Sequence, residues 1–473
     1  MNALNVSFGF TITSGARQFL VREGLHFRMY PTGKNRNFGE ELGRHQIDLL
    51  RIGMAVHLAD SWIRRSRSTN GLRQPVLDIE VLDAAFWAQA DTYVRLKECV
   101  DFLSGGDDWS FSFHTTPNTR HDYRPDLFRG RGLSALVALY SGGLDSAAGL
   151  AVRLATAQGR VVVPVTVRHQ MHKGRLVHEH FNRLIEAGLA SKMDMKPFQV
   201  GAFIKNARLK SDFGLRIRET SHRCRPFLFM CVAGLVANSL SSREVEIFES
   251  GVGSVNLPLI SGVPDFRTTR STHPHFLRLI SNLVSHVNED CVHFVLPFAS
   301  RTKAEIVRQA KELGMEELLR KSISCILHPL RRSSGRQCGH CPACVYRRQA
   351  MINGGIDEDR DAYDIDLFSP SSTLHDIPEK LLKPIQAFHQ QAARLAELDT
   401  GRVPYVFRKY LYATKVVSSD EELAPHVEVY RRYRREWVRL VSDARRRGLP
   451  WIANDSSRAH ALSYGVEAEG ANP

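Results

Sequence analysis

The sequence lacks the features that mark secreted, membrane-spanning and repetitive proteins. Only eight cysteines occur among 473 residues, too few for a disulfide-based scaffold, and the first five residues contain no basic region followed by an apolar core. No apolar run is long enough to span a bilayer, and no internal repeat is evident. We therefore expect a cytoplasmic protein with reduced thiols and no membrane partner.

The phosphate-binding motif of Walker-type NTPases is also absent, because no GxxxxGK[ST] pattern occurs in the chain. A different glycine-rich turn lies between the apolar residues 136–140 and the alanine-rich residues 147–154. The turn consists of Ser141, Gly142, Gly143, Leu144, Asp145 and Ser146. Its glycines allow the backbone to approach a phosphate closely, and the amides of a helix N-terminus favour negative charge. The pattern predicts a strand, a glycine turn and a helix that together bind an anion.

An ordinary strand-to-helix turn, with Asp145 or Ser146 as the N-cap, is the alternative interpretation. Capping needs one polar residue, whereas this turn contains two serines, two glycines and a carboxylate. The composition of the turn therefore favours the anion site.

Four thiols in the second half of the chain have the spacing of a metal site. They are Cys325, Cys338, Cys341 and Cys344. Four thiolates complete a tetrahedron around zinc with no open position for water, so the metal would be structural. His328 or His340 is an alternative ligand in place of one cysteine. The other cysteines lie in apolar surroundings, where we expect inert core thiols; they are Cys99, Cys224, Cys231 and Cys291.

The SGGxDS turn after an apolar run resembles the PP-loop of the ATP pyrophosphatase superfamily. With the downstream Cys…CxxCxxC cluster, residues 131–350 resemble the 7-cyano-7-deazaguanine synthase (QueC) family. The resemblance implies an α/β fold with a parallel-sheet, Rossmann-like core of the adenine-nucleotide alpha-hydrolase type and a zinc-binding loop. It implies ATP, Mg²⁺ and Zn²⁺ as cofactors, with pyrophosphate held by the turn.

Further matches to the family lie between the two motifs. Gln170 and His172 resemble the Gln and His of its YGQRH segment, which implies nucleotide contacts for both. Arg225 resembles the arginine that opens its RNxxF helix, and Lys303 lies in a TKAEIV helix start. The resemblance implies that the catalytic residues are Asp145, Ser146, Arg225 and Lys303.

Each match also has a local explanation. Thr302 and Glu305 form a capping box that many helices use, which leaves the role of Lys303 open. Arg225 opens a strongly apolar helix, where a charge usually has an anionic partner. The chain departs from the family at Arg168-His169, at Pro226 and throughout the substrate stretch. The resemblance therefore supports the use of ATP more strongly than it supports the family's substrate.

The family chemistry implies attack of a deazaguanine carboxylate on the α-phosphate of ATP, followed by transfer of the acyl group to an amine. In the QueC family the amine is ammonia, and a second adenylation gives a free nitrile. Long QueC-like proteins with extra terminal domains resemble the anti-phage defence members, the QatC-type proteins of the Qat system, in which a partner protein of the same system supplies the amine. A non-catalytic, ATP-gated nucleic-acid binder is a third hypothesis.

Composition predicts three domains: an N-terminal α+β accessory domain (1–130), the QueC-like domain (131–355) and a helical C-terminal extension (356–473). We expect strands at residues 5–12 and 76–81, a helix at about 40–65 and an acidic linker at 357–361.

A formal net charge of +14 is compatible with a nucleic-acid partner, and arginines alternate with aromatic side chains in residues 430–437. Tyr430, Tyr433, Trp437 and Leu440 also have the spacing of one helix face. We favour a helix with its aromatic side chains buried, and an acidic partner or anionic substrate explains the charge equally well.

Overall fold

The structure is a computed structural model with two compact units. It describes residues 8–14, 17–31, 38, 42–65, 71–115, 134–157, 159–169, 171–191, 194–214, 219, 221–259, 269–327, 336–368 and 377–453. The first unit comprises Met1–Ser141, Arg153–Phe248 and Pro264–Pro297, and the second comprises Gly142–Val152, Glu249–Val263 and Phe298–Pro473.

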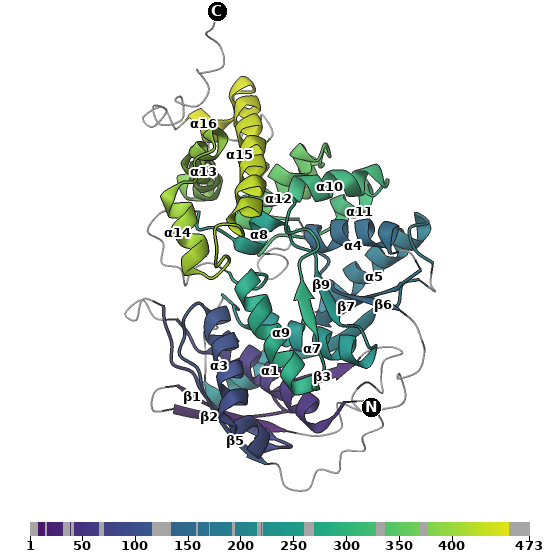
Figure 1. Cartoon of the computed structure of the whole chain (residues 1–473), viewed down its shortest axis with the longest axis vertical. Coiled ribbons are helices and arrows are strands. Elements are labelled where there is room, and N and C mark those ends of the chain that lie inside the picture. Colours follow the sequence, from purple (N-terminus) through teal and green to yellow (C-terminus); the bar gives the residue numbers. More distant parts are fainter. Residues whose placement is uncertain are drawn as a thin grey trace, which may run out of the picture. The chain divides into compact units, whose positions relative to one another are not determined.

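A six-stranded sheet forms the centre of the first unit (Figure 1). Its strands, in spatial order, are β10 (His293–Val295), β9 (Glu244–Ile247), β6 (Ala135–Leu139), β7 (Val161–Arg168), β8 (Phe198–Ile204) and β3 (Phe27–Pro31). The first five are parallel, and β3 pairs antiparallel with β8. β6 and β7 are near-continuous apolar runs because parallel strands are covered on both faces. The predicted α/β class with a parallel core sheet is confirmed.

The strand order identifies the edge at which a ligand site is expected. The parallel strands, numbered along the chain, lie in the order 5-4-1-2-3, so the order reverses between β6 and β9. Doubly wound sheets bind ligands beyond the carboxyl ends of the strands at such a reversal. The segments that follow β6 and β9, from Tyr140 and from Phe248, are therefore the expected site-forming segments.

The helices of the first unit are α1 (Arg44–Trp62), α2 (Ala84–Ala88), α3 (Ala90–Ser104), α5 (Met171–Glu186), α6 (Asn206–Phe213), α7 (Arg225–Ser239) and α9 (Pro274–Asn288). α7 is apolar on nearly all sides because α1 and α9 both pack against it. Gly53 of α1 permits this packing: a Cβ there would lie 3.1 Å from Leu228 Cδ1 of α7.

The N-terminal segment shares the core of the first unit. It forms a four-stranded sheet in the order β2 (Arg17–Arg22), β1 (Gly9–Ser14), β4 (Val76–Val81) and β5 (Ser110–Thr115), and it also contributes β3 to the larger sheet. The predicted strand at 76–81 and the predicted long helix, observed as α1, are confirmed. The strand expected at 5–12 is described only from residue 8 and is assigned as β1. An accessory domain ending near residue 130 stays a prediction, since the compact unit continues to Ser141.

The second unit is mainly helical, as predicted for residues 356–473. Its elements are α4 (Leu144–Thr156, from its start to Val152), α8 (Gly251–Val255), α10 (Lys303–Glu312), α11 (Glu316–Lys321), α12 (Pro342–Asn353), η5 (Arg360–Ala362), α13 (Glu379–Arg394), η7 (Ala396–Thr400), α14 (Tyr405–Ala413), α15 (Leu423–Arg446) and α16 (Pro450–Ala453). Figure 1 shows α15 as a long helix beside α13. Within the part of the chain that the structure describes, no helix is both long and apolar enough to cross a bilayer.

The aromatic side chains of α15 face the core of the second unit. Tyr430, Tyr433 and Trp437 are fully buried, and the Trp437 ring stacks on Phe388 of α13 with 5.6 Å between ring centroids. The prediction of a buried aromatic face is confirmed. These rings are therefore not available to stack on bases.

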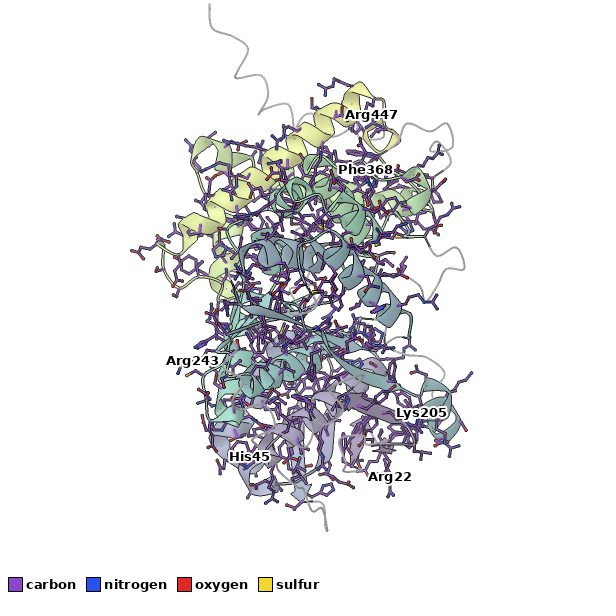
Figure 2. The ribbon with its side chains drawn as sticks, turned by 90° about the vertical axis from the view of Figure 1, so that its right-hand side faces the viewer. Arg22, His45, Lys205, Arg243, Phe368 and Arg447 are labelled. Carbon is purple, nitrogen blue, oxygen red and sulfur yellow. The ribbon has the colours of Figure 1, made fainter. Side chains whose placement is uncertain are left out.

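Carboxylates accompany most arginines of α15. Arg431 and Arg432 pair with Glu428, and Arg434 pairs with Asp399. Arg446, and Arg447 at the C-cap, each lie 3.3 Å from Asp443. Figure 2 shows Arg447 at the end of the helix. Much of the positive charge that the sequence concentrates here is thus balanced locally.

The acidic segment 357–361 is not a linker, contrary to the prediction. Glu358 is buried, and its carboxylate accepts hydrogen bonds from Arg347 at 2.7 and 2.9 Å and from the Tyr363 hydroxyl at 2.8 Å. Arg347 is fully buried and also donates to Ser322 Oγ at 2.6 Å. The segment closes a buried ionic network within the second unit.

We expect Glu358→Ala to lower the free energy of unfolding by about 3–5 kcal/mol, because it leaves Arg347 buried without its carboxylate. Glu317→Ala is the matched control, since Glu317 forms exposed pairs at 3.8 Å with Arg320 and Lys321, and should cost less than about 1 kcal/mol. Urea denaturation measures both. Equal effects would contradict the buried network.

Candidate active site

The glycine turn follows β6 and forms the predicted strand, turn and helix. Gly142 has φ of 78°, a left-handed conformation that favours glycine. The Gly143 carbonyl accepts hydrogen bonds from Ala147 N at 2.9 Å and from Ser146 Oγ at 3.0 Å. Asp145 and Ser146 lie within the first turn of α4, so the alternative in which either is the N-cap is wrong.

The segment before Cys325 is hydrogen-bonded to this turn. Ile323 N donates to the Gly142 carbonyl at 3.1 Å, and Leu144 N donates to Ser324 Oγ at 3.4 Å. Ser324 was not predicted from the sequence, because nothing in its spacing links it to a turn 180 positions earlier. The turn and the cysteine loop are therefore joined within the second unit.

Asp145 and Lys303, predicted as site residues from distant motifs, form an ion pair. Lys303 Nζ lies 2.8 Å from Asp145 Oδ2, with side chains 11 % and 20 % exposed. Thr302 caps α10 and forms the predicted capping box with Glu305, which places Lys303 at the first position of the helix. Lys303 Nζ also lies 4.1 Å from the ring centroid of Tyr346.

The electrostatics of this pair keep the lysine charged. Burial lowers the pKa of Lys303, but the negative charge of Asp145, with a further contribution from Glu249 in its ionised form, outweighs burial and the net shift is upward. A fixed cation therefore lies beside the N-terminus of α4. Both features attract phosphate oxygens.

Glu249 is a third member of the cluster that sequence reasoning missed. It lies two residues beyond β9, on the segment where the strand order reverses. Burial, and then the charge of Asp145, raise the pKa of Glu249 to about 8, so this carboxyl carries a proton at neutral pH. Its Oε1 accepts from Ser250 N at 3.1 Å. The preceding strand β9 has two glutamates of its own, Glu244 and Glu246, so the local sequence does not single out Glu249.

Arg225 opens α7 in the first unit, as predicted. Its NH1 lies 3.3 Å from His169 Nε2, and burial lowers its pKa while Asp60 raises it in part. Among the described residues Arg225 forms no ion pair within 4.0 Å, so the anionic protein partner expected for it is not found there.

Gln170 and the side chain of His172 lie outside the described residues. Ser141 is exposed and is the last residue of the segment Met1–Ser141 of the first unit.

The four predicted cysteines come together. Their Sγ atoms all lie within 4.8 Å of one another, and those of Cys338 and Cys344 are 3.8 Å apart. Tetrahedral zinc with Zn–S bonds of about 2.3 Å needs sulfurs about 3.8 Å apart, so the residues fit the metal. Backbone amides of Cys338 and Cys341 donate to Cys325 Sγ and Cys338 Sγ at 3.4 and 3.2 Å, which stabilises thiolate charge. His340 is not part of the cluster, and His328 lies outside the described residues.

The remaining cysteines divide into two groups. Cys99, Cys224 and Cys231 are buried, and burial raises the pKa of all three thiols, as expected for inert core thiols. Cys291 is exposed, so its assignment to the core is wrong. Its loop position, two residues before β10, leaves the side chain in solvent.

The parallel sheet, the SGGxDS turn and the four-thiol loop together define the class of PP-loop ATP pyrophosphatases. Residues 135–355 match the family model for "Queuosine biosynthesis protein QueC". The chain is 31% identical over 235 residues to the 7-cyano-7-deazaguanine synthase of Anaeromyxobacter dehalogenans (strain 2CP-C), an alignment of 47% of this chain and 93% of that protein. The corresponding synthase of Anaeromyxobacter sp. (strain Fw109-5) is 32% identical over 46% of this chain and 92% of that protein.

The chain belongs to the QueC family, and the prediction of an enzyme of this class is confirmed. The 7-cyano-7-deazaguanine synthase of Magnetococcus marinus is a further relative, 29% identical over 95% of its length. Residues 1–134 and 356–473 lie outside the family match.

We expect Cys341→Ala to lose bound zinc, because three thiolates leave the tetrahedron open. Metal analysis of purified protein measures zinc per chain. Cys291→Ala is the control, since this exposed thiol lies outside the cluster, and it should retain the full metal content. Retention of zinc by Cys341→Ala would show that another ligand set holds the metal.

Gly339→Ala should also release zinc. Gly339 has φ of 79°, and a Cβ would lie 1.7 Å from the Ile365 carbonyl oxygen, so the turn between Cys338 and Cys341 cannot keep its shape. Gly159→Ala is the matched control, because Gly159 has φ of 78° with nothing within 4 Å of an added Cβ. Equal zinc contents in both variants would contradict the steric requirement at Gly339.

The raised pKa of Glu249 predicts a pH-dependent stability. Its folded pKa of about 8 exceeds the ordinary glutamate value of 4.5, so its contribution to stability is fully present below about pH 4.5 and is lost as pH rises through 8. Glu249→Gln should therefore gain stability relative to the unmodified protein between pH 5 and 9, by on the order of 2 kcal/mol. Denaturant titrations at several pH values measure it. Parallel stability curves would contradict the shift.

Proposed function

We propose that the protein activates a deazaguanine carboxylate with ATP, forming AMP and pyrophosphate, and transfers the acyl group to an amine. The observation that carries this proposal is the cluster of Asp145, Lys303 and Glu249 beside the first turn of α4. The Lys303–Asp145 distance of 2.8 Å places a cation where a helix N-terminus already favours a phosphate. Membership of the QueC family supports the same chemistry.

In this proposal the glycine turn holds the nucleotide. Ser141, Gly142, Gly143 and Ser146 bind the pyrophosphate part of ATP through amides and hydroxyls, and Lys303 stabilises the charge that develops as pyrophosphate leaves. The Asp145 carboxylate is an oxygen ligand of the kind that Mg²⁺ prefers, as Glu249 is in its ionised form, and Mg²⁺ would neutralise phosphate charge there. Gln170 and His172 are proposed to contact the nucleotide.

The proposed reaction has two steps, adenylation of the carboxylate and transfer of the acyl group to the amine. A carboxylate oxygen of the substrate attacks the α-phosphorus, the bond to the β-phosphate oxygen breaks, and pyrophosphate leaves with the electron pair. The amine nitrogen then attacks the acyl carbon of the acyl-adenylate, AMP leaves and the nitrogen loses a proton. Arg225, a buried cation with no ion pair among the described residues, is proposed to neutralise an anionic group during these steps.

A protein amine is the acceptor that we favour, as in the QatC-type members of anti-phage defence systems. Two features of the chain support this choice. The segment around residues 251–275 departs from the family's substrate stretch, and large segments lie outside the family match on both sides. A partner protein of the same defence system would then carry the acyl group.

Ammonia is the alternative acceptor, with a second adenylation that dehydrates the amide to free 7-cyano-7-deazaguanine. The names of the curated relatives favour this alternative. The nucleic-acid hypothesis is weaker, because Tyr430, Tyr433 and Trp437 are buried and several arginines of α15 are paired with carboxylates.

The proposal is tested by incubating the protein with ATP, Mg²⁺ and 7-carboxy-7-deazaguanine, with and without ammonia. AMP and pyrophosphate should form, and mass spectrometry of small molecules and of candidate partners identifies the product. A free nitrile supports the synthase alternative, and a mass-shifted partner supports protein acylation. ATP binding without AMP under any condition would refute the catalytic proposal.

Lys303→Met should lower the rate of AMP formation by about 10²–10³-fold, because the removed charge acts on the departing pyrophosphate. Lys321→Met is the matched control, since Lys321 is 59 % exposed on α11, and it should retain full activity. A Lys303→Met enzyme as active as the control would remove Lys303 from the mechanism.

A further inference from the structure

One face of α15, outside the family match, contacts the start of the helix that carries Lys303. Glu436 is 3 % exposed, and its Oε1 accepts a hydrogen bond from the Thr302 hydroxyl. Its Oε2 accepts from Gln349 Nε2 of α12 at 2.8 Å. Both carboxylate oxygens of Glu436 are thus used, one of them on the residue next to Lys303.

The contact fixes the capping box of α10 from outside the helix. The Thr302 hydroxyl accepts from Glu305 N at 3.2 Å while it donates to Glu436. Glu305 Oε2 accepts from Thr302 N at 2.9 Å, and its Oε1 accepts from Arg432 Nε at 2.7 Å. Arg432 and Glu436, one turn apart on α15, therefore hold both members of the box.

The same helix also supports the ring on which Lys303 rests. Tyr433 packs edge-on against Tyr346, with ring centroids 6.0 Å apart, and Lys303 Nζ lies over the Tyr346 ring. The Tyr346 hydroxyl is 3.1 Å from Ser250 Oγ, next to Glu249. Two neighbours of Lys303, Thr302 and Tyr346, thus contact side chains of α15.

Burying the carboxyl group of Glu436 costs free energy that a role in packing alone does not explain. Burial raises its pKa, and the hydrogen bonds from Thr302 and Gln349 lower it in part. Among the described residues it forms no ion pair within 4.0 Å. An apolar residue would fill the position without the cost of burying a carboxyl group, so we look for a role in geometry.

We propose that Glu436 is a positioning residue that orients Lys303 toward Asp145 through the Thr302 hydroxyl. The helical extension is then part of the machinery that prepares the ATP site. This inference rests on the proposed role of Lys303 in the ATP step. Its structural half, the orientation of Lys303, is measurable without any turnover.

The test is the acetylation rate of Lys303 in the full-length protein, followed by peptide mass spectrometry across a pH series. Lys303 should react slowly, because it is 11 % exposed and ion-paired. Glu436→Ala should raise its rate roughly five- to tenfold, with the exposed Lys321 as internal reference. Glu436→Gln should stay slow, because Gln349 can reverse its amide and keep both hydrogen bonds.

Asp443→Ala is the matched control, because it removes a carboxylate from the same helix at an exposed site. Thr302→Ala removes the same hydrogen bond from the other side, so the double variant should be no faster than either single variant. An unchanged Lys303 rate in both Glu436→Ala and Thr302→Ala, or an equal rise in Asp443→Ala, would overturn the proposal. If the unmodified protein forms no AMP, the proposed function fails, while the labelling result still decides the positioning of Lys303.

Discussion

The ion pair between Asp145 and Lys303 is the contact on which the site depends. It joins the first turn of α4 to the first residue of α10 across 158 positions of sequence. The pair requires a left-handed Gly142 on one side and a capped helix start at Thr302 on the other. Because both side chains are mostly buried, their attraction is little screened by solvent, and an incoming phosphate would meet a preoriented cation.

Glu249 completes the electrostatic balance of this site. Two carboxyl groups face one ammonium group, and the higher pKa of Glu249 keeps one of them protonated near neutral pH. The site then has little net charge of its own, which suits a ligand that brings several negative charges with its cation. The reversal of strand order between β6 and β9 explains why these residues arise on segments that follow those two strands.

The second unit combines the glycine turn and the four-cysteine loop, which lie within the family match, with a helical extension that the match does not include. The zinc-type loop is tied to the glycine turn through Ser324, and α15 is tied to α10 through Glu436. The arginine-rich sequence of α15 thus serves packing and local ion pairing: its aromatic residues fill the core, and carboxylates accompany most of its arginines.

Local patterns predicted much of this structure. Local sequence is enough to predict three features: the turn at 141–146, the four cysteines and the strand at 76–81. Each depends on residues that are close together in the sequence. Glu249, Ser324 and Glu436 could not be predicted, because each matters through a partner brought close only by the tertiary fold. The acidic segment around Glu358 was wrongly predicted for the same reason. Its charge suggests exposure, whereas the Glu358 carboxylate is buried and accepts a hydrogen bond from Arg347. Gln170 and His172 stay predictions.

The proposed function depends on one step, the attack of a substrate carboxylate on the α-phosphorus of ATP. The most direct test supplies 7-carboxy-7-deazaguanine with ¹⁸O in both carboxylate oxygens and analyses the AMP by mass spectrometry. We expect one ¹⁸O atom in each AMP released by amine transfer, since that oxygen stays on phosphorus when the bond between it and the acyl carbon breaks. Unlabelled AMP, or cleavage to ADP and phosphate, would contradict it.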